Sequence, residues 1–551
     1  MKSIAIRMLT RWNLIIAVLI AIVISIYINY ERIIDPYLMG SIDSRSLYFI
    51  YGFVDKTILT NDLLVQAIVK DPYVYLSSIP LIKPLFFITV FLVRFFYLSL
   101  ALTIHSIAYQ IITAIVVFKI GKSLIDYRSA FALMVVFLIY TSSMDSFYGG
   151  MVRGSGFLII SILYYCMIKK YVLQAILLIP IAFICYPPIL PVVVIVSFFS
   201  AFRSMMIDKK GKFTFFLLVT VTIAILFISF YVNQRLMKST ICELTMSERF
   251  ELSYYSFCKA PLFYFLNDYI LNISEHRDSY AYLTYALLLV ASISMLRKEK
   301  PSILSGERIF IASSLFSFAI VFFMNEGIAT RQLIFSFPLF LIIYCWKIFI
   351  NTFKKYPRLK FVILVVIIFV FVISKRYIIG LESRDRSYYK KAFSYISKLP
   401  KQALIAGHPV GASLVPYFTK KSVFFIDVWD LEVSLLSSDC KKIFNKRKHD
   451  LLEAMYASEP TAIVSFIEKY KITDFLIEDY YYSHDYYSQE FSNNAHTFDG
   501  KEYQDIINTI RMNNENFFLL DAAHKYGHNF GNGIYILPTD TILKIFSKKT
   551  G

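Results

Sequence analysis

The sequence predicts a polytopic α-helical membrane bundle followed by an external α/β domain at the C-terminal end. The first observation is composition: 57% of the 551 residues are hydrophobic and 17% are charged, with a mean hydropathy of +0.57. A soluble domain of this length is excluded by those values. The second is a series of apolar runs that ends near residue 374. The third is the polar, Tyr-rich composition of residues 375–551.

The first apolar run follows a basic lead over residues 1–12 and has no small-residue cleavage site after it, which indicates an uncleaved signal anchor with a cytoplasmic amino end. We expect about 11 spans. Residues 171–202 can also form one re-entrant hairpin, since "YPP" interrupts them. The expected spans are 13–29, 95–118, 129–143, 156–168, 171–185, 188–202, 213–232, 281–296, 309–324, 332–350 and 361–374.

The basic residues agree with this topology. The segments expected on the cytoplasmic side hold 20 Lys or Arg against 4 Asp or Glu, as the positive-inside rule requires. The net charge of +18 therefore reflects topology, and we exclude a nucleic-acid partner. Two spans at 84–102 and 104–118 would invert this arrangement, and the charges oppose that alternative. We expect residues 74–93 to form an interfacial helix on the outer leaflet.

The predicted topology divides the chain into a transmembrane domain, 1–374, and an external soluble α/β domain, 375–551. Two large external loops, 30–94 and 233–280, belong to the first domain. In the second domain, alternating patterns predict strands over 402–407, 422–427 and 472–479, a turn and helix over 408–419, and a closing pair formed by 516–521 and 533–538. His408 follows the first of these strands and is interpreted as a turn histidine.

Three charged residues are expected at one level, the outer boundary of the membrane. Asp35 follows span one, Arg153 lies between spans three and four, and Arg331 lies between spans nine and ten. Ionisable groups at membrane depth are candidates for function. Arginine binds phosphate bidentately, and a carboxylate acts as a general base or holds a divalent cation. The alternative is that all three are interfacial anchors or ion pairs between helix ends.

Two cysteines, Cys242 and Cys258, fall in the second external loop. A disulfide between them would close that loop and stabilise it by roughly 3 kcal/mol. No zinc-ligand spacing, phosphate-binding loop or dinucleotide fingerprint is present in the sequence.

The order of three short motifs resembles the GT-C superfamily of membrane glycosyltransferases, and the resemblance covers nearly the whole chain. "IIDPYLMGS" at 33–41 is similar to the Asp-Pro-Tyr stretch of oligosaccharyltransferase catalytic subunits, and "TICE" at 240–243 matches their T-I-x-E pattern. "TRQLIFSFP" at 330–338 keeps an Arg seven residues before a Pro. The W-W-D-Y-G motif of those enzymes is missing, since "DVWD" at 427–430 keeps one Trp-Asp pair. Protein mannosyltransferases and aminoarabinose lipid A transferases are looser relatives that fit as well.

The resemblance implies an enzyme of the cell envelope that moves a sugar, by hexosyl, pentosyl or oligosaccharyl transfer, from a polyprenyl-phosphate donor to an external acceptor. Asp35 would be the base or a metal ligand, with Asp43 as a second acid. Arg331 and Arg153 would hold the donor phosphate, and Glu243 would orient the acceptor or the cation.

The partners expected are the lipid-linked donor and membrane lipids. Asp35 and Glu243 are the expected ligands of a metal, for which Mg²⁺ and Mn²⁺ are the candidates; the sequence leaves the cofactor, the sugar, the acceptor and the oligomeric state open. A non-catalytic GT-C-like protein or a transporter in surface-polysaccharide assembly is the alternative, although a secondary transporter predicts internal repeats that the sequence does not show.

Overall fold

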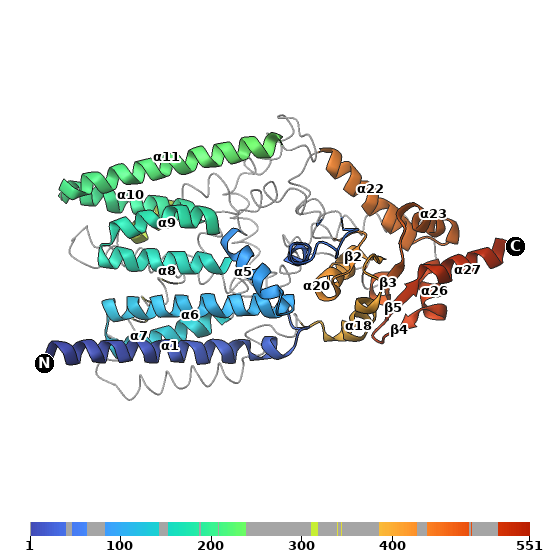
Figure 1. Ribbon diagram of the computed structural model, residues 1–551, viewed down its shortest axis with the longest axis horizontal. Helices are drawn as coiled ribbons and strands as arrows, with labels where there is room; N and C mark the ends of the chain where they lie inside the picture. Colours follow the sequence, from blue (N-terminus) through green and yellow to red (C-terminus); the bar gives the residue numbers. More distant parts are fainter. Residues whose placement is uncertain are drawn as a thin grey trace, which may run out of the picture.

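The computed structural model combines a bundle of long helices at one end with an α/β unit at the other (Figure 1). The N-terminus lies at the end of the bundle away from the α/β unit. The structure describes residues 2–39, 47–62, 65, 83–142, 153–186, 189–207, 209–238, 310–317, 339, 343, 346, 385–426, 438–483, 486, 508 and 516–550.

The long helices of the bundle lie side by side because each carries apolar residues around most of its circumference. Between α6 and α7, Gly121 allows a close approach: a Cβ there would lie 3.0 Å from the Cα of Ala130. The bundle helices are α1 (Lys2–Ile34), α6 (Leu98–Leu124), α7 (Tyr127–Ser142), α8 (Arg153–Lys169), α9 (Val172–Cys185), α10 (Leu190–Ile207) and α11 (Lys209–Lys238).

Several predicted spans match helices with shifted ends. The first helix continues to Ile34, so Glu31 and Arg32 belong to it rather than to a loop. The run at 171–202 forms two separate helices, α9 and α10. A hydrogen bond links them, since the hydroxyl of Ser197 in α10 donates to the carbonyl of Ala175 in α9 at 3.1 Å. The shorter α5 (Lys83–Val93) covers the described part of the expected interfacial helix.

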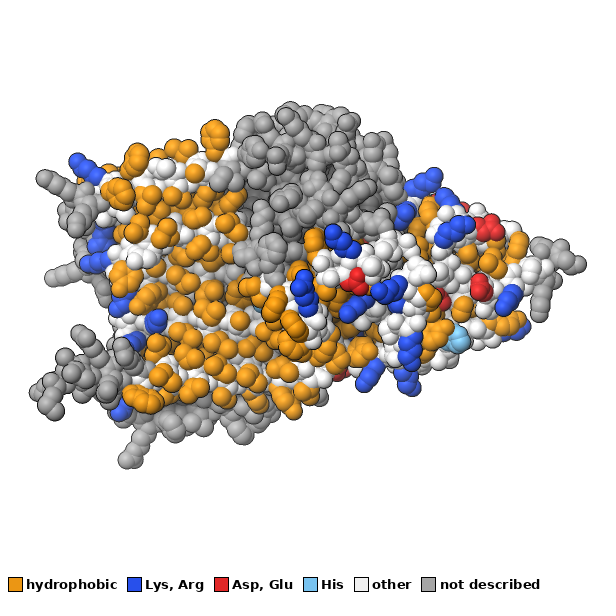
Figure 2. Space-filling model, in the orientation of Figure 1, with side chains coloured by type: hydrophobic (Ala, Val, Ile, Leu, Met, Phe, Trp, Pro, Cys, Tyr) orange, Lys and Arg blue, Asp and Glu red, His pale blue; other side chains and the backbone are white. Residues whose placement is uncertain are grey.

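Hydrophobic side chains cover much of the face of the bundle that is seen in Figure 2. On α11, Phe213 and Phe227 are 69% and 73% exposed. Such a continuous apolar surface is unfavourable in water and favourable against lipid. Two helices in the described part of the chain are long and apolar enough to cross a membrane, Trp12–Ile34 and Leu98–Leu124, and five shorter apolar helices accompany them. The count of about 11 spans is therefore not confirmed.

The α/β unit contains a five-stranded mixed sheet in the order β2-β1-β3-β5-β4. Strand β1 pairs in parallel with both β2 and β3, and β5 pairs antiparallel with β3 and β4. The strands predicted over 402–407, 422–427, 472–479 and 533–538 are confirmed, although the one at 422–427 is shorter than predicted. The strands are β1 (Leu404–Gly407), β2 (Ser422–Val423), β3 (Asp474–Glu478), β4 (His528–Asn529) and β5 (Ile534–Pro538).

Helices flank the sheet. One correction concerns residues 516–521, predicted as a strand: they lead into helix α26 (Phe518–Tyr526). Leu519, Ala522 and Ala523 form its buried face, at the spacing of three and four residues typical of a helix. The other helices are α18 (Lys390–Lys398), α19 (Pro409–Ala412), α20 (Val415–Thr419), α22 (Ser438–Met455), α23 (Pro460–Tyr470) and α27 (Thr539–Thr550).

The segment predicted as the first external loop shares a hydrophobic core with the α/β unit. Tyr48, Phe49 and Tyr51, at and within the short helix α2 (Ile50–Val54), belong to the same cluster as the residues of the sheet. The hydroxyl of Tyr51 donates to the carbonyl of Tyr417 at 3.2 Å. Although the loop belongs to the transmembrane domain by sequence, it folds onto the α/β unit.

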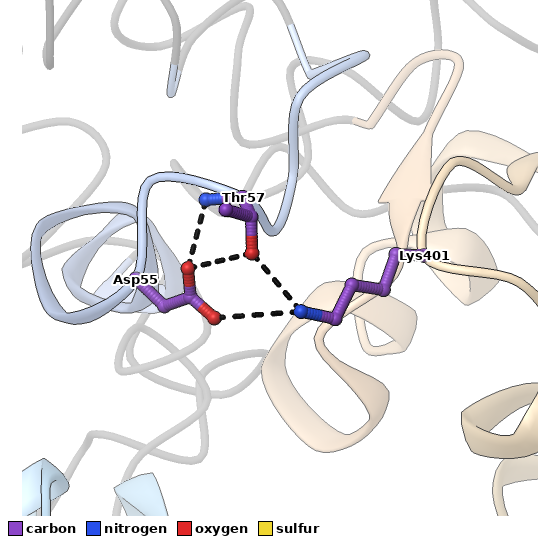
Figure 3. Close-up of polar contacts among 3 residues, drawn as sticks. All are labelled: Asp55, Thr57 and Lys401. Carbon is purple, nitrogen blue, oxygen red and sulfur yellow. Dashed lines mark hydrogen bonds and ion pairs between the residues drawn. The ribbon is translucent and has the colours of Figure 1, made fainter.

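A cluster of polar contacts formed by Asp55, Thr57 and Lys401 lies at the edge of this contact (Figure 3). The ammonium group of Lys401 lies 3.8 Å from Asp55 Oδ2 and donates to the hydroxyl of Thr57 at 3.0 Å. Nearby, the side-chain amide of Asn61 donates to the carbonyl of Gln402 at 2.7 Å. These contacts hold loop residues 55–61 to the start of β1.

Candidate functional site

The carboxylate of Asp35 is oriented by a turn that begins where α1 ends. The N–H of Leu38 donates to the carbonyl of Asp35 at 3.2 Å, which closes the turn over residues 35–38. Pro36 occupies the second position, where its fixed φ favours such a turn. The N–H of Tyr37 donates to Asp35 Oδ1 at 2.9 Å, the side-chain contact typical of an Asx turn. The Asp-Pro-Tyr sequence therefore points one carboxylate oxygen back at its own backbone.

The start of α6 holds this turn from one side. The Tyr97 hydroxyl donates to the carbonyl of Ile33, and the Ser99 hydroxyl donates to the carbonyl of Pro36, both at 3.1 Å. Burial and the negative charge of Asp35 together raise the pKa of Tyr37. This phenol therefore stays neutral and lies within electrostatic reach of the carboxylate.

The α/β unit holds the turn from the other side. Leu38 and Asp385 form an antiparallel bridge, and the N–H of Arg386 donates to the carbonyl of Tyr37 at 3.1 Å. The ring of Tyr37 stacks on Phe418 of α20 with 5.4 Å between centroids. Asp35 thus sits where the C-terminal end of α1, the start of α6 and the α/β unit meet.

Arg32 is a site residue that the sequence analysis missed. It lies one turn before Asp35 in α1, yet its side chain is 1% exposed. Its Nη1 donates to Asn29 Oδ1 at 3.2 Å, and the Asn29 amide donates to Gln110 Oε1 at 3.0 Å. The spacing of Ser25, Asn29 and Arg32 along α1 was the available signal, because residues four and three apart share one helix face.

The remaining predicted site residues are only partly covered. Arg153 is the first residue of α8, and its backbone alone is described. Asp43, Arg331 and Glu243, and the proposed disulfide partners Cys242 and Cys258, lie outside the described residues. The expected meeting of Asp35 with Arg331 and Glu243 remains a prediction.

One group of possible metal ligands occurs in the described part of the chain, on α22. His449, Asp450 and Glu453 offer ligand atoms within 4.8 Å of one another. Asp450 Oδ2 already accepts hydrogen bonds from Lys469 at 2.7 Å and Tyr470 at 2.6 Å. His449 and Glu453 are exposed and Asp450 is half-buried; the group includes neither predicted metal ligand, and it does not identify a metal.

A second polar centre lies where β1 and β3 end. The strand order reverses between these neighbouring parallel strands. In α/β sheets, ligands often bind beyond the carboxyl ends of the strands at such a reversal. Glu478 closes β3 and is buried; burial raises its pKa from the ordinary 4.5 to about 7. The Tyr389 hydroxyl donates to Glu478 Oε2 at 2.5 Å. The other carboxyl oxygen, Oε1, has no hydrogen-bond partner among the described residues.

His408 follows β1 and serves as a helix cap, as its interpretation as a turn residue implied. Its Nδ1 accepts the N–H of Val410 at 3.4 Å, so Nε2 carries the proton and faces the hydroxyl of Tyr486 at 3.0 Å. The imidazole stacks on Tyr481 with centroids 3.8 Å apart. Burial lowers the pKa of His408 to about 3, so the ring stays neutral at physiological pH.

Comparison with known proteins finds similarity at the level of structure. No protein-family model and no curated protein sequence matches the chain. An oligosaccharyltransferase of Archaeoglobus fulgidus, tethered with an acceptor peptide containing the NVT sequon, has a TM-score of 0.45 and 10% identity over 86% of this chain and 70% of that one.

Two further structures of the Archaeoglobus fulgidus oligosaccharyltransferase are similar over the same share of this chain, 86%. The one named AglB, in complex with an inhibitory peptide and a dolichol-phosphate, has a TM-score of 0.42, 9% identity and 70% of its own chain covered. The other, a complex with Zn and sulfate, has a TM-score of 0.40, 11% identity and 69% coverage.

Proposed function

We propose that the chain is an integral-membrane glycosyltransferase of the GT-C type, with about 11 spans, that transfers a sugar from a polyprenyl-phosphate carrier to an acceptor on the external face. The observation that carries the proposal is the Asp35 turn. A carboxylate held at the end of an apolar helix, between α6 and the α/β unit, would stand at the depth where a lipid phosphate headgroup lies. The three motifs in GT-C order support the same reading.

The proposed orientation puts the α/β unit outside the cell. Within the bundle, Lys and Arg side chains lie mainly at the end away from that unit, and others lie over the α/β unit itself (Figure 2). The first group has the distribution expected of a cytoplasmic end. The lipid-linked donor would then approach Asp35 from the outer leaflet.

Asp35 would act as the general base. The acceptor hydroxyl oxygen attacks the anomeric carbon while its proton passes to the carboxylate of Asp35. The bond between the anomeric carbon and the phosphate oxygen breaks, and polyprenyl phosphate leaves with the electron pair. Attack from the face opposite the phosphate inverts the configuration. Since the donor is already bound to the membrane, the protein mainly supplies positioning and charge stabilisation.

The other predicted residues are proposed to complete the site. Arg331 and Arg153 would hold the donor phosphate, and Glu243 would orient the acceptor, with Asp43 as a second acid. When a divalent cation such as Mg²⁺ or Mn²⁺ is bound, Asp35 and Glu243 would supply the oxygen ligands that such ions prefer.

The test is Asp35→Asn, which keeps the side-chain shape and removes the base. The purified protein in nanodiscs receives the polyprenyl-linked glycans extracted from source membranes, and mass spectrometry follows the polyprenyl phosphate released. We expect release to fall by about 10²-fold or more, the contribution of a general base. The control is Glu31→Gln, which removes a carboxylate one turn earlier on α1. Full release by Asp35→Asn would rule out the proposed role.

A further inference from the structure

Four aromatic rings form a continuous stack between the Asp35 turn and the core of the α/β unit. We call Tyr37, Phe418, Phe393 and Tyr389 the aromatic column. Consecutive centroids lie 5.4, 5.3 and 4.9 Å apart, and the planes of consecutive rings differ by 26°, 19° and 9°. These separations match those of favourable offset-stacked pairs. The rings come from three separate parts of the chain, so the column exists only in the folded protein.

Each end of the column is fixed to a carboxyl group. At the inner end, the Tyr389 hydroxyl donates to Glu478 Oε2 at 2.5 Å, and Glu478 is the last residue of the central strand β3. Tyr389 and Phe393 are 3% and 1% exposed, so this half of the column is held by the core. At the outer end, the N–H of Tyr37 donates to Asp35 Oδ1. The Tyr37 ring and the orientation of the Asp35 carboxylate therefore share one residue.

We infer that the aromatic column is a positioning device: Phe418 and Phe393, inside the α/β unit, set the direction of the Asp35 carboxylate by fixing the ring of Tyr37. This inference rests on the proposed function. Backbone contacts already hold the peptide groups on both sides of Tyr37, since the carbonyl of Pro36 accepts from Ser99 and the carbonyl of Tyr37 accepts from Arg386. Stacking of the Tyr37 ring on Phe418 adds a side-chain contact that keeps the turn in this arrangement against the α/β unit. A displacement near 1 Å at a reacting group lowers rates by up to about 10²-fold. A contact that keeps the Asp35 carboxylate in place can therefore affect the reaction rate strongly.

The α/β unit would thus take part in the reaction without contacting the sugar. Phe418 is a positioning residue, since it touches Tyr37 and not the carboxylate. Its effect should appear in kcat rather than in KM for the donor, because Asp35 acts in the transition state and the lipid tail binds elsewhere.

The experiment compares Phe418→Leu with Phe424→Leu in the full-length protein in nanodiscs. Both changes remove one aromatic ring from the same core, but Phe424 packs against Phe466 and Tyr470 and stands outside the column. Two quantities are measured: hydrogen exchange of the Tyr37 and Leu38 amides, which donate within the turn, and the kinetics of polyprenyl phosphate release from the extracted glycolipids.

For Phe418→Leu we expect about 10-fold faster exchange of both amides, since the turn opens by roughly 1.4 kcal/mol more readily. We also expect kcat to fall by about 10-fold with KM within 2-fold. Phe424→Leu should leave both the exchange rates and kcat at wild-type values. Phe418→Tyr, which keeps an aromatic ring at this position, should also keep both at wild-type values. If Phe418→Leu does not fold, Tyr37→Leu at the half-buried end of the column serves instead, with the same expected changes.

The outcomes separate this inference from the proposed function. If Phe418→Leu leaves hydrogen exchange and kcat unchanged while Asp35→Asn strongly lowers polyprenyl phosphate release, the positioning role of the column is refuted. The proposed glycosyltransferase function would still stand. In the Asp35→Asn background, adding Phe418→Leu should cause no further loss of single-turnover release; an additional 10-fold loss would mean that Phe418 does not act through Asp35. Full activity of Asp35→Asn would remove the proposed function, and with it the catalytic role of the column.

Discussion

The buried carboxyl group of Glu478 should make the stability of the α/β unit depend on pH. Burial raises its pKa from the ordinary 4.5 to about 7 in the folded protein. The hydroxyl of Tyr389 donates to one oxygen, which favours the ionised form but does not outweigh the loss of water. Replacing the group by Glu478→Gln keeps its shape, leaves an acceptor for Tyr389 and removes the ionisation.

The magnitude follows from the two pKa values. Between pH 4.5 and 7 the unfolded chain loses the proton while the folded protein keeps it, so stability falls as pH rises. The stabilisation is fully present below pH 4.5 and lost as pH passes about 7. At 1.36 kcal/mol per pH unit, the difference is about 3 kcal/mol. Glu478→Gln should therefore be more stable than the wild type by about 3 kcal/mol at pH 8 and nearly equal to it at pH 4.

The measurement is hydrogen exchange of the β3 amides in the full-length protein, corrected for the intrinsic pH dependence of exchange. The wild type should lose about 3 kcal/mol of opening free energy across this range, and Glu478→Gln should give a flat profile. Glu468→Gln, on the exposed face of α23, is the control and should follow the wild type. A wild-type profile that rises with pH, or a Glu478→Gln profile as steep as the wild type, would refute the reasoning.

Three further predictions concern packing and the contact between loop residues 55–61 and the α/β unit. Gly411→Ala should destabilise by about 1–3 kcal/mol, because a Cβ there would lie 1.8 Å from Glu478 Oε1; an unchanged melting temperature would contradict this. Asn61→Ala should release the loop from the start of β1, which would be measured as faster hydrogen exchange near residue 61. Lys401→Met should cost under about 1 kcal/mol of stability, since that lysine side chain is 64% exposed. Equal effects of the two substitutions would contradict this prediction. Arg32→Leu should lower the melting temperature in detergent, because loss of the guanidinium removes a donor to buried Asn29 at a cost of about 1–3 kcal/mol, and a stable variant would show that the buried arginine is not needed for folding.

Local patterns accounted for much of the α/β unit. Strands β1 and β3 follow from short apolar runs bounded by turn residues, and both were predicted at nearly their observed positions. The run at 516–521 was ambiguous, because "NFFLLD" suits either a strand or a helix by composition. Burial of Leu519 and Ala523 against the sheet selected the helix. Short apolar segments of this kind are decided by the surface that they meet, which local sequence does not contain.

The sequence by itself determined that the helices of the bundle are apolar on most sides, that Asp35 follows the first of them, and that Pro36 bends the chain there, because these properties depend on neighbouring residues. Only the tertiary structure decided that Arg32 is buried beside Asn29 and Gln110, that the segment around α2 shares a core with the sheet, and that Tyr37 stacks on Phe418. The last contact joins residues 381 positions apart. Burial of apolar surface is non-directional and carries no local signal, so the partner of each ring is settled only when the whole chain has folded.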